Sequence, residues 1–380
     1  MDKHEALGRL QNFVRWLTES GVTDRKSYRL WTKKENVEED MAKMFAYERV
    51  GKMPSITALL APYFHAELPL IGLNYSPVAH NTLHAFPDGW TPVLRLCRGL
   101  ILRSDGEVVA VPFPKFFNFG EHPETTDLPD EPFEVKEKMD GHLGIIFDLG
   151  GTLHLCTRQS FAGPSAKLGG EMLARIAKQK GWEATFPRHL TVLVEIIHPK
   201  TRVHVDYGRK RGFVLIGAYD RTTLDDHGSH AELLGLGKLL GIPVAECWNC
   251  PSLKDLRKRM KDQSIRNREG GVAFYPSSGI RAKHKFETYI GLMVEAKLSY
   301  AYLMNRMIAG NLDRMLDTLA EEIRPKADAM VKAIRKARRF KDEKKAREYL
   351  YALEPGKQKN QYYRGICRKL LKHLSGSKAA

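Results

Sequence analysis

Apolar residues recur at helical spacing near the start of the chain. The stretch from residue 7 to residue 17 carries them three or four positions apart, which is the spacing of one helix face: Leu7, Leu10, Val14 and Leu17. Ser20-Gly21 interrupts this spacing, as the end of a helix often does. We therefore predict that residues 1–60 are mainly helical.

From about Val93 the pattern changes to short apolar strands separated by turn residues. Ser104-Asp105-Gly106 separates VLRLCRGLIL from EVVAVPF, and Gly150-Gly151 separates GIIFDL from TLHLCTR, so two hairpins are predicted. Further strands are predicted at LTVLVEII, GFVLIGAY, GGVAFYP and IRAKHKF. A helix is predicted among them at SAKLGGEMLARIAKQKG.

After Phe286 helical spacing returns and continues to the end, including MLDTLAEEI at residues 315–323. The pattern therefore predicts an α+β protein whose antiparallel strands lie between helical ends. We expect a helical N-terminal region at residues 1–90, a strand-rich core at 91–290 and an all-α domain at 291–380.

Composition and charge narrow the class of protein. The chain has 380 residues, of which 43% are hydrophobic and 28% are charged, as in ordinary globular proteins. The start, MDKHEALGRL, lacks the basic-then-apolar layout of a signal peptide, so we predict a soluble cytoplasmic protein without a membrane partner. A formal net charge of +16 favours a polyanionic partner such as nucleic acid, although a basic protein without such a partner carries the same charge.

The cysteines do not predict a disulfide framework, because their number, five, is odd. Cys247 and Cys250 form one CxxC, and His227 and His230 lie upstream, so the four residues resemble a set of zinc ligands. Ser229 and Glu232 also match a capping box that opens the helix AELLGLGKLLG, which needs no metal. Because the sequence has no second CxxC, we favour the structural explanation.

Lys138 stands two residues before Asp140-Gly141, where a predicted strand meets a turn. A free lysine has a pKa of about 10.4, so only about one in a thousand is an uncharged nucleophile near neutral pH. Enzymes that use a lysine nucleophile lower this pKa by burial or by neighbouring cations. The chain offers candidate cations in strand-like places: Arg158, Lys283 and Lys285.

Two carboxylates accompany these cations. Glu195 lies within the apolar strand LVEII, and Glu269 precedes GGVAF. A carboxylate in such surroundings is costly unless it is paired or bound to a metal, and Mg²⁺ or Mn²⁺ would suit it. Lys283 and Lys285 are two residues apart on a predicted strand and so point to one face. Each feature also has an ordinary structural explanation, such as a solvated turn lysine, a charged sheet edge or a salt-bridged core acid.

The order of these features resembles the covalent nucleotidyltransferases, and most of all the phage-type RNA ligase 1 family. The resemblance runs from about Leu96 to Phe286. KMDG at Lys138 resembles motif I, and three later blocks resemble motifs III, IV and V: VEIIHP with Glu195, EGGV from Glu269, and KHK from Lys283 to Lys285. Upstream, CRGLIL and PKFFN resemble the blocks whose basic residues contact ATP phosphates: Arg98 and Lys115.

The resemblance implies an ATP-dependent RNA ligase that joins 5′-phosphate and 3′-hydroxyl RNA ends through AMP bound to Lys138. It implies an antiparallel-sheet adenylyltransferase core at residues 91–290. It assigns catalysis to Lys138, Asp140, Glu195, Glu269, Lys283 and Lys285, and a Mg²⁺ or Mn²⁺ site to Glu195 and Glu269. It assigns nucleotide contacts to these residues: Arg98, Lys115, Glu137, Lys138, Gly141, Arg158, Glu195, Glu269, Lys283 and Lys285.

Three positions depart from the family pattern. His142 stands where serine is common, Leu73 stands where an aromatic nucleotide contact is expected, and Thr288 replaces an aromatic residue after motif V.

Other functions stay open at this point. A DNA ligase or a capping guanylyltransferase would normally carry an Arg-x-Asp-Lys tetrapeptide, which this sequence lacks. A non-catalytic RNA-binding protein with a decayed ligase core is a further alternative. For a ligase, a separate kinase or phosphatase that prepares the RNA ends is left open as a partner. Clustered basic residues and tyrosines in the C-terminal helices predict RNA binding there, although such runs are often only solvated faces.

Overall fold

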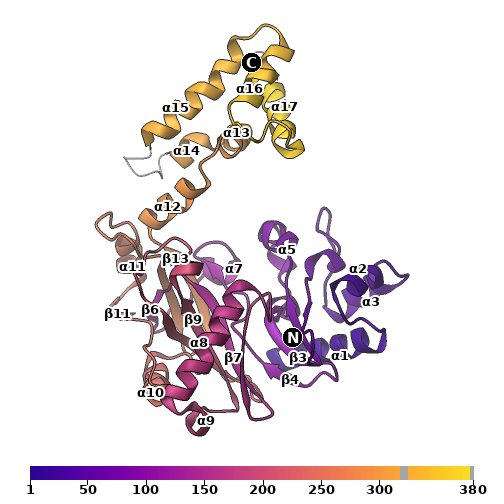
Figure 1. The fold of residues 1–380 in the computed structure, drawn as a ribbon, viewed down its shortest axis with the longest axis vertical. Coiled ribbons are helices and arrows are strands. Elements are labelled where there is room, and N and C mark those ends of the chain that lie inside the picture. Colours follow the sequence, from indigo (N-terminus) through magenta and orange to yellow (C-terminus); the bar gives the residue numbers. More distant parts are fainter. Residues whose placement is uncertain (317–323, 377–380) are drawn as a thin grey trace. The chain divides into compact units, whose positions relative to one another are not determined.

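The chain, described by a computed structural model at residues 1–316 and 324–376, divides into two units (Figure 1). The first unit comprises Met1–Asp255 and Glu269–His284, and the second comprises Leu256–Arg268 and the residues from Lys285 onward. Each unit has its own buried core and is described by itself. Among the described residues, no helix is both long and apolar enough to cross a membrane.

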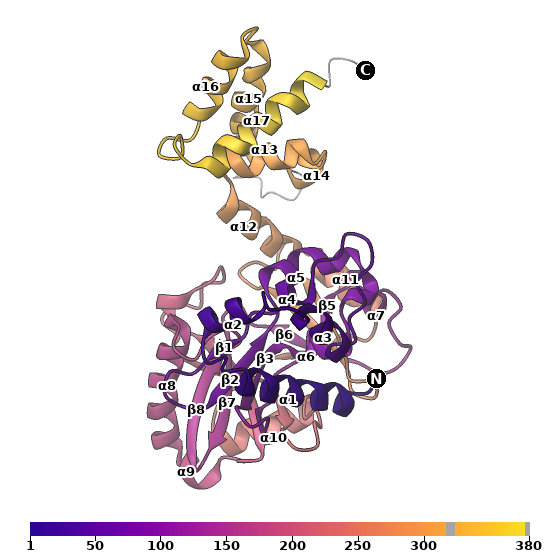
Figure 2. The same cartoon turned by 90° about the vertical axis from the view of Figure 1, so that its right-hand side faces the viewer.

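The first unit begins with helices that share a buried cluster with a four-stranded sheet (Figure 2). Asp2 accepts a hydrogen bond from the Glu5 amide and so caps the first helix, whose apolar face is buried. The helices are α1 (Lys3–Glu19), α2 (Arg25–Trp31), α3 (Val37–Met44), α4 (Ile56–Leu59), α5 (Pro77–Thr82) and α6 (Pro92–Leu96). The sheet has the order β1 (Tyr63–Phe64), β2 (Leu70–Asn74), β3 (Arg98–Arg103) and β4 (Val108–Ala110).

Two further sheets form the rest of this unit. One contains antiparallel neighbours in the order β10 (Gly212–Asp220), β9 (Leu190–Ile197), β7 (His142–Leu149) and β8 (Thr152–Thr157). The other has the order β11 (Cys247–Trp248), β6 (Glu134–Lys138), β12 (Gly270–Tyr275), β13 (Ile280–Lys285) and β5 (Phe117–Asn118). Helix α8 (Pro164–Lys180) packs along β8. The remaining helices are α7 (Pro123–Thr126), α9 (Trp182–Thr185), α10 (His230–Leu240) and α11 (Leu253–Met260), the last of which crosses the unit boundary.

The second unit is helical in its described part. It contains α12 (Glu287–Lys297), α13 (Tyr300–Ile308), α14 (Leu312–Leu316), α15 (Arg324–Arg335), α16 (Glu343–Ala352) and α17 (Gln361–Gly376). One apolar cluster holds these helices together, with fully buried residues from four of them: Leu303, Met304, Ile334, Leu350 and Leu370. Charged residues cover the outer faces, as expected for amphipathic helices.

The structure confirms most of the elements predicted from the sequence. Both hairpins, α8, β9 and β10 form as expected, and Ser229 and Glu232 make the predicted capping box of α10. The prediction that strand begins at Val93 is wrong, because Pro92–Leu96 is a helix capped by Thr91. Strands β1 and β2 were not predicted. The helix predicted at residues 315–323 runs partly outside the described residues.

Candidate active site

Lys138 is the last residue of β6, and it lies opposite Gly270 of β12. This pairing places Glu269, the residue before β12, next to the lysine. Lys138 Nζ lies 2.6 Å from Glu269 Oε2; the lysine side chain is 25% exposed and the glutamate side chain 5%. The amine is therefore held in a fixed position by a buried carboxylate while remaining accessible to a bound molecule.

Glu195 approaches the same turn from β9. It lies opposite Leu143 of β7, and its Oε1 accepts a hydrogen bond of 2.9 Å from the Gly141 amide. Burial raises the pKa of Glu195 to about 7, the charge of Glu269 adds to this rise, and Lys138 opposes it. Two neighbouring carboxylates that repel each other in a buried place are suited to a cation.

The turn after Lys138 is fixed by Asp140. Its Oδ2 accepts hydrogen bonds from the amides of His204 and Val205 at 2.8 and 2.6 Å, and its own amide donates to the Tyr207 hydroxyl at 2.8 Å. The carboxylate predicted to be catalytic is thus occupied in the described structure by backbone amides. Asp140 acts here on the position of the turn.

Four predicted nucleotide contacts form a basic group near Lys138: Arg98, Lys115, Arg158 and Lys283. Burial lowers the pKa of Lys115 to about 8, with help from the charges of Arg98 and Arg158. Burial lowers the pKa of Lys283 well below its ordinary value, with help from Lys115 and Arg98. Aromatic rings lie against these amines, since Lys115 Nζ is 4.0 Å from the Phe117 ring centroid.

Two side chains that the sequence did not indicate support this group. Glu121 accepts hydrogen bonds from the amide and side chain of Asn118 at 2.7 and 2.6 Å. Burial opposes its charge, but those hydrogen bonds and the charges of Lys115 and Lys283 outweigh burial and lower the pKa of Glu121. The hydroxyl of Tyr75 accepts a hydrogen bond of 2.6 Å from Arg158. The sequence contains Asn74-Tyr75 beside Leu73, but only the fold shows which aromatic residue meets the arginine; Leu73 itself is fully buried.

Two other predicted site residues, Glu137 and Lys285, differ from Lys138 in the strand face or the unit to which they belong. Glu137 lies opposite Gly271 of β12, and strand alternation directs its side chain to the face of β6 opposite that of Lys138. Lys285 belongs to the second unit, where its Nζ lies 4.9 Å from the Tyr289 ring centroid. Their predicted roles remain predictions.

The alternative zinc set has other contacts. His227 Nδ1 lies 3.1 Å from Glu232, and Cys250 donates a hydrogen bond to the Ser252 carbonyl. In the part of the chain that the structure describes, no three or more His, Cys, Asp or Glu side chains gather as metal ligands would.

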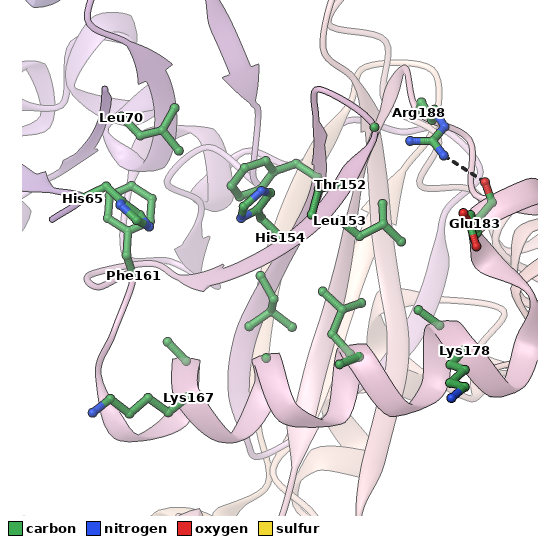
Figure 3. A pocket seen from close by; sticks show the side chains of 18 of the residues that line it. His65, Leu70, Thr152, Leu153, His154, Phe161, Lys167, Lys178, Glu183 and Arg188 are labelled. Atoms are coloured by element: carbon green, nitrogen blue, oxygen red, sulfur yellow. Dashed lines mark hydrogen bonds between the residues drawn. The ribbon is translucent and has the colours of Figure 1, made fainter. Parts of the chain in front are cut away.

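A separate hollow of about 780 Å³ lies between β8 and α8. Figure 3 shows Lys167 and Lys178 on the helix, with His65 and Phe161 at one end and Arg188 at the other. None of the site residues predicted from the sequence is among the residues that line it. The predicted site residues of the first unit therefore gather around Lys138, away from the lining of this hollow.

The comparison with known protein families matches the part of the chain that contains the predicted site residues. A family model described as RNA ligase matches residues 96–288, which is half of the chain. A protein named "Putative RNA ligase" from Thermovibrio ammonificans is 37% identical over 121 residues, covering 31% of this chain and 32% of that protein. RNA ligase 1 of bacteriophage TS2126 is 32% identical over 130 residues, covering 30% of this chain and 32% of that protein. The matched segments thus span about a third of the length of these relatives.

Among solved structures, an archaeal ATP-dependent RNA ligase has a similar fold. It aligns with a TM-score of 0.50 at 15% identity, covering 92% of this chain and 98% of that chain. At this identity the likeness concerns the fold alone.

The turn beside Lys138 has no room for a side chain at Gly141. An added Cβ would lie 2.5 Å from the Ile196 carbonyl oxygen, a backbone atom that cannot move aside. We predict that Gly141→Ala lowers the free energy of unfolding by about 1–3 kcal/mol, the usual cost of overpacking.

The matched control is Gly170→Ala in α8, where nothing lies within 4 Å of the added Cβ. This substitution should be neutral or stabilising by up to about 1 kcal/mol, because alanine favours a helix. Urea unfolding compares the two variants. Equal stability of Gly141→Ala and the unaltered protein would contradict the close approach of β9.

Proposed function

The chain belongs to the RNA ligase family, and on that basis we propose that it is an ATP-dependent RNA ligase. It joins a 5′-phosphate to a 3′-hydroxyl through AMP carried on Lys138. The observation that carries this proposal is the placement of an accessible lysine, paired with Glu269, beside buried basic side chains. Such a group of cations suits a triphosphate.

In the first step the Lys138 Nζ lone pair attacks the α-phosphorus of ATP. A P–N bond forms, the bond from the α-phosphorus to the bridging oxygen breaks, and pyrophosphate leaves. Glu269 Oε2, 2.6 Å from Nζ, is placed to hold the proton that the amine must lose. Arg98, Lys115 and Lys283 stabilise the negative charge that develops on the phosphate oxygens.

Glu195 and Glu269 fit a divalent cation such as Mg²⁺ or Mn²⁺. Both offer carboxylate oxygens, and the charge of Glu269 raises the pKa of Glu195, so a cation between them would relieve their repulsion. When bound, such an ion neutralises charge on the phosphates. The protein's own residues then bind and orient the nucleotide.

In the later steps AMP passes to an RNA 5′-phosphate, and the 3′-hydroxyl of the second RNA end then displaces AMP. The C-terminal helices are the proposed region of general RNA binding. Most of their clustered basic side chains are exposed: Arg335, Lys336, Arg338, Arg339, Lys344, Lys345, Arg364, Arg368, Lys369 and Lys372. Tyr362 is 72% exposed and free to stack on a base. The neighbouring Tyr363 is not available for such stacking, because it is buried and donates a hydrogen bond to the Leu350 carbonyl.

The proposed reaction is tested with 5′-phosphorylated, 3′-hydroxyl RNA and ATP. We predict sealing by the unaltered protein, and loss of product to background in Lys138→Ala and Lys138→Arg. Alanine removes the amine, and arginine keeps a charge without a usable nucleophile. The exposed Lys33→Arg is the matched control and should seal normally.

Two further reactions separate the alternatives. Sealing of matched DNA ends in preference to RNA would favour a DNA ligase, and labelling by GTP instead of ATP would favour a capping enzyme. Sealing by folded Lys138→Arg would refute the role of Lys138.

A second prediction follows from the low pKa of Lys115. Below about pH 8 its amine is charged in the nucleotide-free protein, and above that pH the charge is lost. Bound phosphate favours the charged amine, so affinity for the nucleotide should fall as pH rises through 8, by up to about tenfold per pH unit. Calorimetry with α,β-methylene-ATP, which cannot transfer AMP, measures this dependence.

The control is Lys115→Arg, since an arginine stays charged at all these pH values. We expect the fall in affinity between pH 7.5 and pH 9.5, a range of about two pH units, to be smaller in this variant. An identical pH profile in both proteins would show that Lys115 does not contact the phosphates.

A further inference from the structure

The connection between β9 and β10, residues 198–211, is strongly basic, and we call it the basic loop. Its exposed cations are Lys200, Arg202, Arg209, Lys210 and Arg211. It contains a single acidic residue, Asp206, which pairs with Arg202 at 2.9 Å. Within the described residues, no acidic oxygen lies within ion-pair distance of Arg209, Lys210 or Arg211.

The loop is attached to the turn that follows Lys138. Asp140 accepts hydrogen bonds from the amides of His204 and Val205, and its amide donates to Tyr207. His142 Nε2 lies 3.1 Å from the Thr201 carbonyl oxygen. Val205 is 1% exposed and anchors the middle of the loop. The loop thus has a defined position relative to the nucleophile.

A narrow crevice joins the loop to the turn. Asp140 and Gly141 line it together with Arg202, Tyr207 and Lys210. Two of the loop's cations therefore lie beside the glycine whose amide is bonded to Glu195.

Two cations of the loop, Lys200 and Arg211, act on the same histidine, His198. Burial lowers the pKa of His198, and the charges of Arg211 and Lys200 lower it further. Positive charge gathered in this way attracts an external anion. The nucleotide phosphates already have their own basic group in Arg98, Lys115 and Lys283, so the loop is available for a second anion.

We propose that the basic loop binds the phosphates at the 5′ end of the RNA strand that accepts AMP. The proposal rests on the proposed ligase function, because that reaction brings an RNA 5′-phosphate to Lys138. Arginine side chains bind phosphate through paired hydrogen bonds and supply affinity without sequence readout. Among its large apolar side chains, all of which the structure describes, the loop exposes Val203 alone, at 39%. Such a basic surface with little apolar area favours RNA over an apolar protein surface.

This site serves the transfer of AMP from Lys138 to the RNA. An oxygen of the RNA 5′-phosphate attacks the phosphorus of the AMP on Lys138, and a P–O–P linkage forms. The P–N bond breaks, and its electron pair returns to Nζ, which takes a proton from water. Two anions must approach each other in this step, so cations beside the turn lower its barrier.

The test compares Arg209→Gln/Lys210→Gln/Arg211→Gln with a control of equal charge loss at exposed lysines, Lys33→Gln/Lys34→Gln/Lys52→Gln. Circular dichroism confirms that both variants fold. Equilibrium binding is measured with matched 5′-phosphate and 5′-hydroxyl RNA, which requires no AMP adduct. The unaltered protein and the control should prefer the 5′-phosphate, and the loop variant should lose that preference.

Salt dependence and transfer kinetics provide a second readout. Each lost contact with a phosphate should reduce the slope of log affinity against log salt by about 0.7, so three contacts reduce it by about 2. Transfer of AMP from isolated adenylylated protein to limiting RNA should slow in the loop variant. Labelling of the protein by ATP involves no RNA and should stay within about twofold, as for most surface substitutions.

Unchanged 5′-phosphate preference and salt slope in the loop variant would overturn the proposal, whether the loop then meets an acidic protein or only solvent. Loss of RNA affinity in Arg335→Gln/Arg338→Gln/Arg339→Gln alone would likewise assign the phosphate contacts to the C-terminal helices. Failure of the unaltered protein to take AMP from ATP would instead contradict the proposed ligase function, because the binding assay does not depend on that adduct.

Discussion

The burial of several like charges in one place is the constraint on which the candidate site depends. Arg98, Lys115 and Lys283 lose hydration when the chain folds, which lowers the pKa of each. The charge of Arg98 lowers the pKa of both lysines further, and the charge of Lys115 lowers that of Lys283. Glu121 offsets only part of this repulsion. A bound polyphosphate would replace the repulsion among these cations with attraction. This arrangement of charges therefore favours the binding of an anion. Lys138 lies within range of the same charges, because it also lowers the pKa of Lys283.

Close backbone approach gives this charge arrangement its geometry. Gly141 allows β9 to lie against the turn, so that Glu195 reaches the Gly141 amide while Glu269 reaches Lys138 from β12. Asp140 then ties the turn to residues 204 and 205. The same few residues therefore position Lys138, the two carboxylates and the basic loop. A change at the turn would affect nucleotide chemistry and RNA placement together.

The local pattern of apolar and turn residues predicted the helices and strands. The contacts between side chains distant in sequence could be seen only in the fold. Apolar spacing and turn residues located both hairpins, α8 and β9, because these signals act over a few residues. The helix at Pro92–Leu96 was missed because its apolar residues also suit a strand. Partners distant in sequence were not predictable: Tyr75 meets Arg158 83 residues later, and Asp140 meets His204 64 residues later. Motif order predicted Lys138, Glu195 and Glu269 as site residues, but it did not predict the residues that hold them in place.

The central claim is that the amine of Lys138 itself forms the covalent bond to AMP. The most direct measurement is peptide mapping by mass spectrometry of the unaltered protein after incubation with ATP and Mg²⁺ and without RNA. The account predicts one modified peptide, with AMP on Lys138, and loss of that AMP when pyrophosphate is added back. AMP on another residue, or no covalent adduct in folded protein, would contradict it.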